Sequence, residues 1–446
     1  MSDHKLGIGW VEEDKKHLLH GEVPLDEFAE KGTGLIIDEA HGIRIRDIHG
    51  REYIDALSGL NCVNVGYSRL ELAQAAMEQM RKLSYFYSGG DATSTATIEY
   101  CSRLAEFLPE GLGRVFLANS GAEANESAYK LARFYWATRG KEGKYKIISR
   151  EMGYHGLNMA TLWVTGMPSL QKKVGPPIAG FPKIPACYCY RCPLNKNYPD
   201  CDLACAQALA ETIEREGPDT IAAFVAEPVY GVGGSIAPPP EYFPKIRKIC
   251  DQYNVLLILD EIITGFGRTG KNFCCQHWDV TPDMMCMAKG MISAYLPISG
   301  VAINQKLFKE MIGPDSFPHL HTCGGHPVAC AVALKHLEIV IREDLVGNAA
   351  RMGAYLMGRL KDLGKYPHVG PVHGMGLLLG LEVVRNKKTK EAFPEETMKK
   401  LIGNIRKQGV IVRSCESRVQ IAPPLIVGKG DIDQIVAAVE AGLAEL

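Results

Sequence analysis

The chain has 446 residues, of which 46% are hydrophobic and 23% charged, an ordinary globular composition that excludes a fibrous or disordered protein. Its formal net charge of −1 gives no overall field that would attract nucleic acid or an acidic membrane surface. No apolar run reaches the length of a membrane span, and residues 1–21 lack the apolar core of a signal peptide. We therefore expect a cytoplasmic protein without nucleic-acid or membrane partners.

Strands and helices alternate through the middle of the chain. Residues 35–55 alternate apolar and polar side chains around two glycine-centred turns, which predicts an antiparallel hairpin. Further on, five short apolar runs separated by helical patterns predict the strands of a mainly parallel α/β sheet, at residues 114–118, 144–149, 220–227, 255–260 and 298–303. After residue 345 the pattern changes to helices, a glycine-punctuated β run, and a β pair of residues 410–413 and 418–421. This change predicts a second, smaller α+β domain.

The stretch from Val255 to Gly290 places two reactive side chains at strand ends. The run VLLILD predicts a strand buried on both faces, and it ends at the carboxylate of Asp260. A second apolar segment, MMCMA, leads to the amine of Lys289. Ligands of open α/β sheets bind at such strand ends, where an acid and an amine can bracket a pyridine ring, as in enzymes that use pyridoxal phosphate (PLP). A buried Asp–Lys ion pair, or two unrelated strand-end residues, would give the same pattern.

Two further strand ends carry residues suited to a cofactor. Small residues from Asn119 to Asn125 form the turn before a helix, and their N–H groups lie at the positive end of its dipole, which favours a phosphate. A plain helix cap by Ser120 or Asn119 explains the same residues. Tyr154 follows the next strand, where an aromatic ring can either stack on a planar cofactor or pack within a loop.

Six segments, in this order and spacing, resemble the class III aminotransferases of PLP fold type I: SGAEAN, YHG, EP, LDEIITGFGRTGK, AKG and HTCGGHP. The resemblance runs from about residue 34 to the C-terminus. The segments VNVGY, RVFLANSGAEANESAYKLAR and IVRSCESRVQIAPPLI are similar to the omega-amino acid:pyruvate branch, which includes taurine:pyruvate and amine:pyruvate enzymes. The resemblance implies a seven-stranded type of sheet in a large domain, residues 66–330, and a small domain built from residues 1–65 and 331–446.

The resemblance also implies roles around the cofactor. Lys289 matches the Schiff-base lysine, whose freed amine then moves a proton between substrate and cofactor carbons. Asp260 matches the acid that keeps the pyridine nitrogen protonated, and Glu227 matches an acid near the ring. Tyr154 and Ile262 are expected on opposite ring faces. The expected phosphate ligands are Ser120, Gly121, Ala122 and, from the neighbouring subunit, Thr322. The resemblance therefore implies a homodimer or a dimer of dimers.

Substrate-facing positions show both agreement with the family and departure from it. Arg413 matches the mobile arginine that receives a substrate carboxylate, a role suited to the guanidinium fork, although a surface salt bridge at a β edge is the alternative. The branch usually carries Trp where this chain has Asn61, and two Phe where it has Gly89 and Gly90. These changes predict a roomier, more polar pocket. Val232 stands where relatives acting on ornithine or 4-aminobutyrate often carry Glu, which argues against those donors.

Five of the 14 cysteines cluster between residues 187 and 205, in an insert between strands. Four of them have C-x2-C-x8-C-x3-C spacing, compatible with a tetrahedral zinc site: Cys189, Cys192, Cys201 and Cys205. Reduced packing cysteines or redox-labile thiols are the preferred explanation, and we assign no metal ligand. His319, His321 and His326 suggest a second metal site, but they lie in the loop of Thr322, where a structural role is preferred.

The leading prediction is a PLP-dependent transaminase that moves an amino group from an omega-amino acid or aliphatic amine, such as taurine or β-alanine, to pyruvate by a ping-pong route. Its partners are therefore a small amino donor and a keto-acid acceptor. A PLP-dependent racemase or aminomutase on the same scaffold is the alternative. A cofactor-free binding protein is disfavoured because Lys289 and Asp260 are both present.

Overall fold

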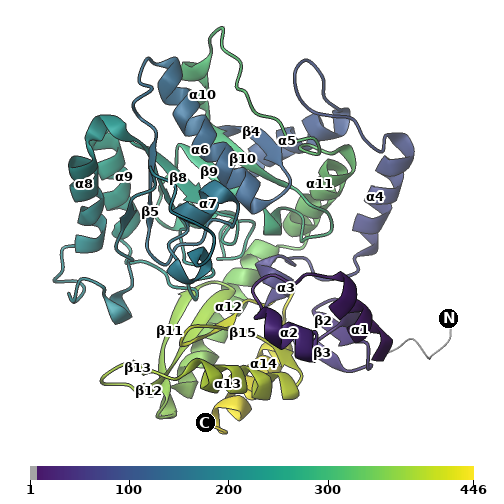
Figure 1. The fold of residues 1–446 in the computed structure, drawn as a ribbon. Coiled ribbons are helices and arrows are strands. Elements are labelled where there is room, and N and C mark those ends of the chain that lie inside the picture. Colours follow the sequence, from purple (N-terminus) through teal and green to yellow (C-terminus); the bar gives the residue numbers. More distant parts are fainter. Residues whose placement is uncertain (1–7) are drawn as a thin grey trace.

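A seven-stranded sheet forms the centre of the upper part of the molecule (Figure 1). The computed structural model describes residues 8–446. Residues 1–7, which are part of the region searched for a signal peptide, lie outside the described residues. The strands follow the order β4 (Leu112–Ala118), β10 (Ser299–Asn304), β9 (Met284–Met287), β8 (Leu256–Asp260), β7 (Ile221–Ala226), β5 (Lys146–Arg150) and β6 (Lys183–Ile184). Only β10 within this sheet runs antiparallel to its neighbours, β4 and β9. The prediction of a mainly parallel α/β sheet is therefore confirmed.

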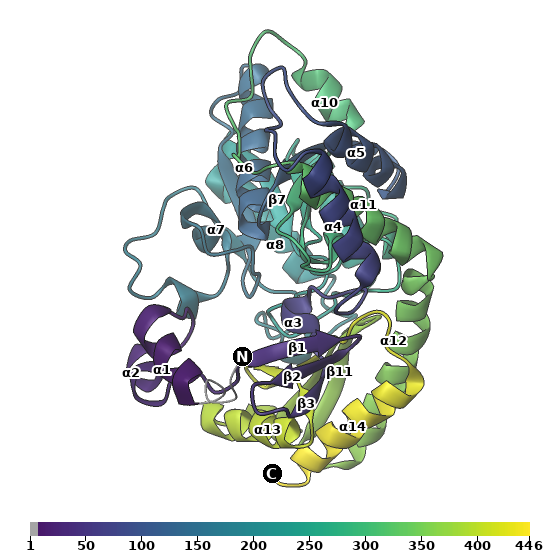
Figure 2. The ribbon, with the colours of Figure 1, turned by 90° about the vertical axis from the view of Figure 1, so that its right-hand side faces the viewer.

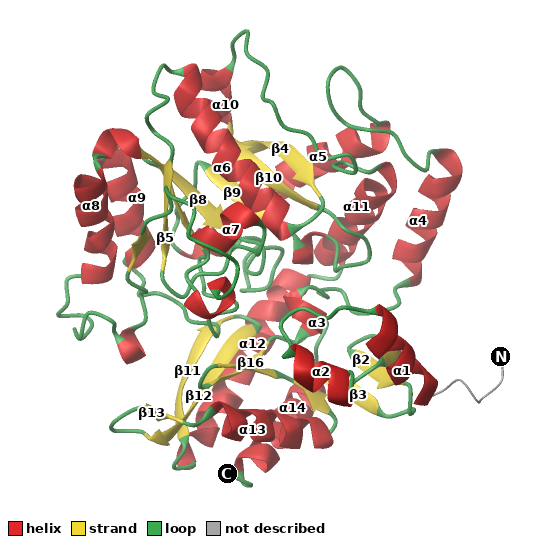
Figure 3. Cartoon of the chain, viewed as in Figure 1, coloured by secondary structure: helices red, strands yellow, loops and turns green. Residues whose placement is uncertain are grey.

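Helices cover both faces of this sheet, which explains its apolar central strands (Figure 3). Every residue of β7, β8 and β9 is buried, because neither face of a parallel sheet meets water. The helices of this region are α4 (Leu70–Lys82), α5 (Thr95–Phe107), α6 (Gly121–Thr138), α7 (Met159–Val164), α8 (Ala204–Glu216), α9 (Tyr242–Gln252), α10 (Gln305–Met311) and α11 (Pro327–Arg342). Helix α11 packs against α4 and α5, and α6 packs against β9 and β10.

A five-stranded antiparallel sheet lies below, with β11 (Val369–Met375), β12 (Leu378–Asn386), β16 (Arg418–Ile421) and β15 (Arg413–Cys415) in order, and β13 (Glu391–Ala392) paired to β12. Its helices are α12 (Leu345–Asp362), α13 (Glu395–Lys407) and α14 (Lys429–Leu443). The N-terminal part of the chain adds α1 (Ile8–His17), α2 (Leu25–Lys31) and the short α3 (Ser58–Asn61), and packs beside this region in the turned view (Figure 2).

A third sheet joins the two ends of the chain. Three N-terminal strands, β1 (Ile37–His41), β2 (Arg44–Asp47) and β3 (Glu52–Asp55), pair antiparallel, so the hairpin expected over residues 35–55 is a three-stranded meander. Strand β14 (Val410–Ile411) then pairs parallel to β3. Because of this pairing, we propose that residues 1–65 and 331–446 form one domain and residues 66–330 the other.

The pairing expected between residues 410–413 and 418–421 was wrong in one respect. The first segment divides at Val412: Val410 pairs with Ile54 in the N-terminal sheet, whereas Arg413 begins β15 and pairs with Gln420 of β16. Val410 is buried in its pairing with the N-terminal sheet, whereas Arg413 belongs to a different sheet. This division decides where the Arg413 side chain lies. Within residues 8–446, the helices are too short or too polar for any of them to cross a membrane.

Candidate active site

Five chain segments meet at the carboxyl ends of the parallel strands. Asp260 is the last residue of β8, and Glu227 directly follows β7. Tyr154 lies in the loop after β5, Lys289 opens a short 3-10 turn after β9, and Gly121 begins α6 after β4. Strand ends at one edge of an open α/β sheet are the usual ligand site of such folds.

Asp260 is buried and held by three donors. His155 Nδ1 lies 2.8 Å from Asp260 Oδ2, and Asn125 Nδ2 donates to the same oxygen at 2.8 Å and to the His155 carbonyl at 2.9 Å. The Ile262 N–H donates to the other oxygen, Oδ1, at 3.1 Å. The carboxylate is therefore fixed in orientation, with a lone pair of Oδ1 left for a further donor. Neither His155 nor Asn125 has a role in the sequence-based prediction, although both lie inside its motifs YHG and SGAEAN.

Lys289 presents an amine with no hydrogen-bond acceptor among residues 8–446. Its backbone is left-handed, with φ of +44°, a conformation that a non-glycine residue rarely adopts and that often marks a functional site. Burial lowers the pKa of the Lys289 amine, and the charge of Arg413 lowers it further, against opposing effects of Cys62, Asp260 and Glu227. A lowered pKa favours the neutral, nucleophilic amine.

Glu227 holds the loop that carries Tyr154. Its Oε1 accepts from the Tyr154 N–H at 2.9 Å, and its Oε2 accepts from the Gly231 N–H at 2.8 Å. Burial raises the pKa of Glu227, and the charge of Asp260 adds to this against the effect of His155. Burial also raises the pKa of Tyr154. The two acids and Tyr154 are therefore close enough to influence one another.

The start of α6 is a close-packed turn with free N–H groups. Ser120 caps the helix by accepting from the Glu123 N–H at 3.2 Å, whereas the N–H groups of Gly121 and Ala122 find no acceptor in the described chain. A Cβ at Gly121 would lie 2.9 Å from Ile262 Cδ1, so a larger residue would require the Ile262 side chain, two residues after Asp260, to shift. Free N–H groups at the positive end of a long helix fit a phosphate, and the fixed carboxylate of Asp260 fits a protonated ring nitrogen. These residues therefore fit PLP.

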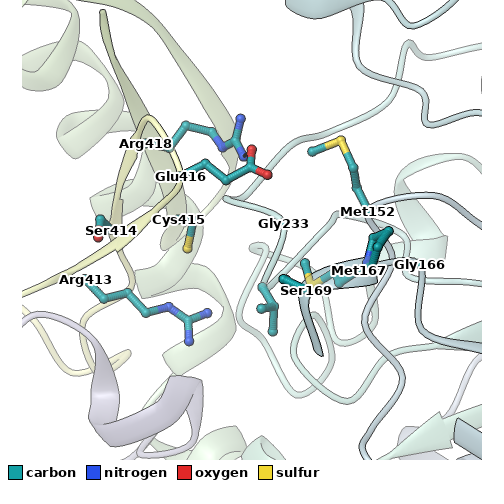
Figure 4. Close-up of a pocket in the computed structure, with 12 residues that line it drawn as sticks. Met152, Gly166, Met167, Ser169, Gly233, Arg413, Ser414, Cys415, Glu416 and Arg418 are labelled. Atoms are coloured by element: carbon teal, nitrogen blue, oxygen red, sulfur yellow. Dashed lines mark hydrogen bonds and ion pairs between the residues drawn. The ribbon is translucent and has the colours of Figure 1, made fainter. Parts of the chain in front are cut away.

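Arg413 borders a cavity of about 310 Å³ between the β15–β16 hairpin and the loops at Gly166 and Gly233 (Figure 4). Arg413 Nε donates to Gln420 Oε1 at 2.7 Å, and Arg413 Nη2 is buried without a partner among the described residues. The charge of Arg413 also lowers the pKa values of Lys289 and Tyr154, so both lie within its electrostatic range.

Four predicted site residues are not joined to this centre within one chain. Thr322 is exposed, and it lines a cavity of about 730 Å³ with Asn119 and Glu123. Gly89 and Gly90 line another, of about 990 Å³, bordered by Leu320. Asn61 is buried, with a left-handed φ of +57° and no partner for either amide atom within residues 8–446. Its neighbour Cys62 lies near enough to Lys289 for the lysine charge to act on the pKa of the thiol, which burial raises.

The cysteine insert and the histidine loop form separate clusters. The four spaced thiols, Cys189, Cys192, Cys201 and Cys205, are free and line a single small cavity. Among the described residues, no three His, Cys, Asp or Glu side chains are arranged to hold a metal ion. In the histidine loop, His319 instead contacts Ser127 Oγ at 2.8 Å and Lys130 Nζ at 2.9 Å.

This combination of a mainly parallel α/β sheet, a strand-end acid, a buried lysine and a phosphate-binding helix start defines a PLP enzyme of fold type I. The sequence model of the family "Aminotransferase class-III" matches residues 28–443. The chain belongs to this family of PLP-dependent aminotransferases, so the predicted family, fold class and cofactor are confirmed.

Three relatives illustrate the similarity. A thermostable (S)-enantioselective omega-transaminase from Thermomicrobium roseum is 42% identical, with a TM-score of 0.95 and 98% of each chain covered. The putrescine–pyruvate aminotransferase of Pseudomonas aeruginosa is 37% identical over 429 residues, which cover 96% of this chain and 94% of that protein. The taurine–pyruvate aminotransferase of Bilophila wadsworthia is 36% identical over 441 residues, which cover 96% and 95% respectively.

Proposed function

We propose that this aminotransferase moves the amino group of an omega-amino acid such as taurine or β-alanine, or of an aliphatic amine, to pyruvate by a ping-pong route. The observation that carries this proposal is the position of Arg413. Its guanidinium is paired with no carboxylate within residues 8–446, and its charge acts on the pKa of the Lys289 amine. An unpaired cation beside the reactive amine is a receptor for an acid group on the substrate. The printed activities of the putrescine and taurine relatives support pyruvate as acceptor.

We assign the chemistry at the cofactor to residues of the strand ends. PLP supplies an electron sink for the substrate carbon that loses its proton. Lys289 would hold the cofactor through its aldehyde in the resting enzyme, and its freed amine would then move that proton. Asp260, oriented by His155 and Asn125, holds the proton on the ring nitrogen. Tyr154 and Ile262 would contact the two faces of the ring, and Glu227 holds the Tyr154 loop in place.

We assign the phosphate to Ser120, Gly121 and Ala122 of one chain together with Thr322 of a second copy. Two observations support a homodimer, alone or paired into a tetramer. Thr322 is exposed in the single chain, and its carbonyl accepts from Tyr85 Oη at 2.7 Å. Large apolar side chains are exposed around it: Met80, Tyr85, Phe86 and Leu320. An exposed apolar surface of this kind is typical of an interface.

Thr322→Ala is expected to weaken PLP binding about tenfold, because one hydrogen bond to a charged phosphate is lost. Fluorescence titration of the apo enzyme with PLP measures this, with Thr389→Ala, an exposed threonine of the β12–β13 turn, as control. Mixing Thr322→Ala chains with Lys289→Ala chains tests the shared site. Mixed dimers should contain one intact site and recover activity at low PLP, and no recovery would contradict the proposal.

The donor is identified by assaying a panel with pyruvate and with 2-oxoglutarate. We expect taurine or β-alanine with pyruvate to give the highest kcat/KM, because the acid group of either donor can pair with Arg413. A donor supplied without keto acid separates the alternatives: a transaminase stops after converting its cofactor once, whereas a racemase or aminomutase continues to turn over. Continued turnover, or no activity with any donor, would reject the proposed reaction.

A further inference from the structure

Gln420 is a fully buried polar side chain that contacts the substrate-facing arginine. It stands directly opposite Arg413 in the β15–β16 pairing. Its Oε1 accepts from Arg413 Nε at 2.7 Å. Its Nε2 donates to the Gly231 carbonyl at 2.7 Å and to Ser235 Oγ at 2.9 Å. Because a carbonyl can only accept, the Gly231 contact fixes the amide so that its oxygen faces Arg413.

The Gly231 loop that holds the other side of Gln420 is itself hydrogen-bonded and closely packed. The Gly231 N–H donates to Glu227 Oε2 at 2.8 Å, and Glu227 Oε1 in turn accepts from the Tyr154 N–H at 2.9 Å. A Cβ at Gly231 would overlap the Ile263 side chain, so the loop is packed tightly against the segment that follows β8. An unbroken series of hydrogen bonds therefore joins the Tyr154 loop to Arg413, with Gln420 as the last member.

The hydrogen bond to Gln420 uses only the Nε end of the Arg413 guanidinium. Nε is bound to Gln420, whereas Nη2 is buried without a partner in the described chain, and residues 8–446 provide Arg413 with no ion pair. The one carboxylate of the hairpin, Glu416, pairs instead with Arg418 at 2.7 Å. A glutamate at position 420 would hold Arg413 equally well but would cancel its charge, whereas a neutral amide holds it with the charge intact.

We propose that Gln420 is a positioning residue: it holds Arg413 at the border of the cavity with the terminal N–H edge of the guanidinium free, so that this edge receives the carboxylate or sulfonate of a substrate. The inference rests on the proposed transaminase function and deepens it. An acid group approaching the free edge forms two parallel N–H···O bonds and satisfies the buried Nη2. A donor without an acid group leaves Nη2 unsatisfied and the charge unpaired, which costs binding free energy. The acid then selects omega-amino acids over simple amines.

The test compares β-alanine with its neutral amide, β-alaninamide, in the holoenzyme. Gln420→Met keeps the side-chain volume but removes all three hydrogen bonds of the amide. We expect KM for β-alanine and for pyruvate to rise about tenfold with kcat within about twofold, while KM for β-alaninamide stays within about twofold. Gln420→Glu pairs with Arg413 and should raise the same two KM values at least as much. Thermal unfolding and cofactor absorbance confirm that each variant is folded and loaded.

Ser417→Ala is the matched control, because it removes buried hydrogen bonds of the same hairpin, to Glu382 at 3.1 Å and from Arg191 at 3.2 Å, without touching Arg413. It should leave the preference for β-alanine over its amide unchanged. Equal rises in KM for acid and amide in Gln420→Met, or the same shift in Ser417→Ala, would show that Gln420 only stabilises the hairpin and would overturn the inference.

A binding measurement separates this inference from the proposed reaction. Propionate carries the acid but neither an amine nor a keto group, so its affinity reports Arg413 alone. Calorimetric titration should show about tenfold weaker propionate binding in Gln420→Met than in the natural enzyme. Unchanged propionate affinity overturns the role of Gln420 even if transamination proceeds. If every donor is inert but propionate affinity falls in the variant, the proposed reaction fails and the role of Gln420 stands.

Discussion

Lys289→Ala is expected to lower kcat by about 10²–10⁴ or more, the contribution of a positioned proton-transfer group, with PLP still bound non-covalently. The amine has no acceptor among residues 8–446, and burial and the charge of Arg413 lower its pKa, which favours its action as a base. The phosphate turn and Asp260 are untouched by the substitution and should retain the cofactor.

Three measurements check this expectation. Steady-state assays give kcat, and cofactor absorbance after dialysis shows retention of PLP. Borohydride reduction followed by peptide mass spectrometry should label the natural enzyme at Lys289 and leave the variant unlabelled. Lys306→Ala, an exposed lysine at the start of α10, is the control and should behave as the natural enzyme. Turnover near the natural rate in Lys289→Ala would contradict the assignment of Lys289.

The central sheet could be predicted because its sequence signals are local. VLLILD and TIAAFVA are continuous apolar runs, and the structure buries every residue of β7 and β8. A residue directly after such a run lies at the ligand edge of the sheet, so Asp260 could be located from its place in the chain alone. The same reasoning located the N–H groups at Gly121, since a small-residue turn follows a strand and starts a helix.

Contacts between distant parts of the chain could not be predicted in this way. His155 and Asn125 meet Asp260 across 105 and 135 residues, and no periodicity of either segment indicates that contact. The division at Val412 was missed for the same reason, because the partner of Val410 lies in β3 near the N-terminus. Whether Thr322 reaches a cofactor depends on a second chain, and the single chain does not join it to Lys289.

Asp260→Asn is expected to lower kcat by about 10²–10³, the usual effect of removing one preorganised electrostatic group. An amide at this position is neutral and cannot hold a proton on the ring nitrogen. The amide also cannot accept all of the hydrogen bonds that its neighbours donate. His155 and Asn125 are positioned as donors toward Oδ2, and the Ile262 N–H donates to Oδ1 at 3.1 Å, so an NH₂ group on either side would face a donor. We therefore expect lower PLP affinity together with the lower kcat.

Glu261→Gln provides the matched control, because Glu261 is the adjacent buried acid and faces other partners. It accepts from the N–H groups of Cys274 at 3.0 Å and Cys275 at 2.8 Å. Burial raises the pKa of Glu261 to about 7, so near neutral pH a glutamine resembles its protonated form. This variant should lose some thermal stability and keep kcat near the natural value. Equal losses of kcat in the two variants would mean that the effect is not specific to Asp260 and would contradict its assignment. A loss confined to Asp260→Asn assigns the effect to the one carboxylate that His155 and Asn125 orient.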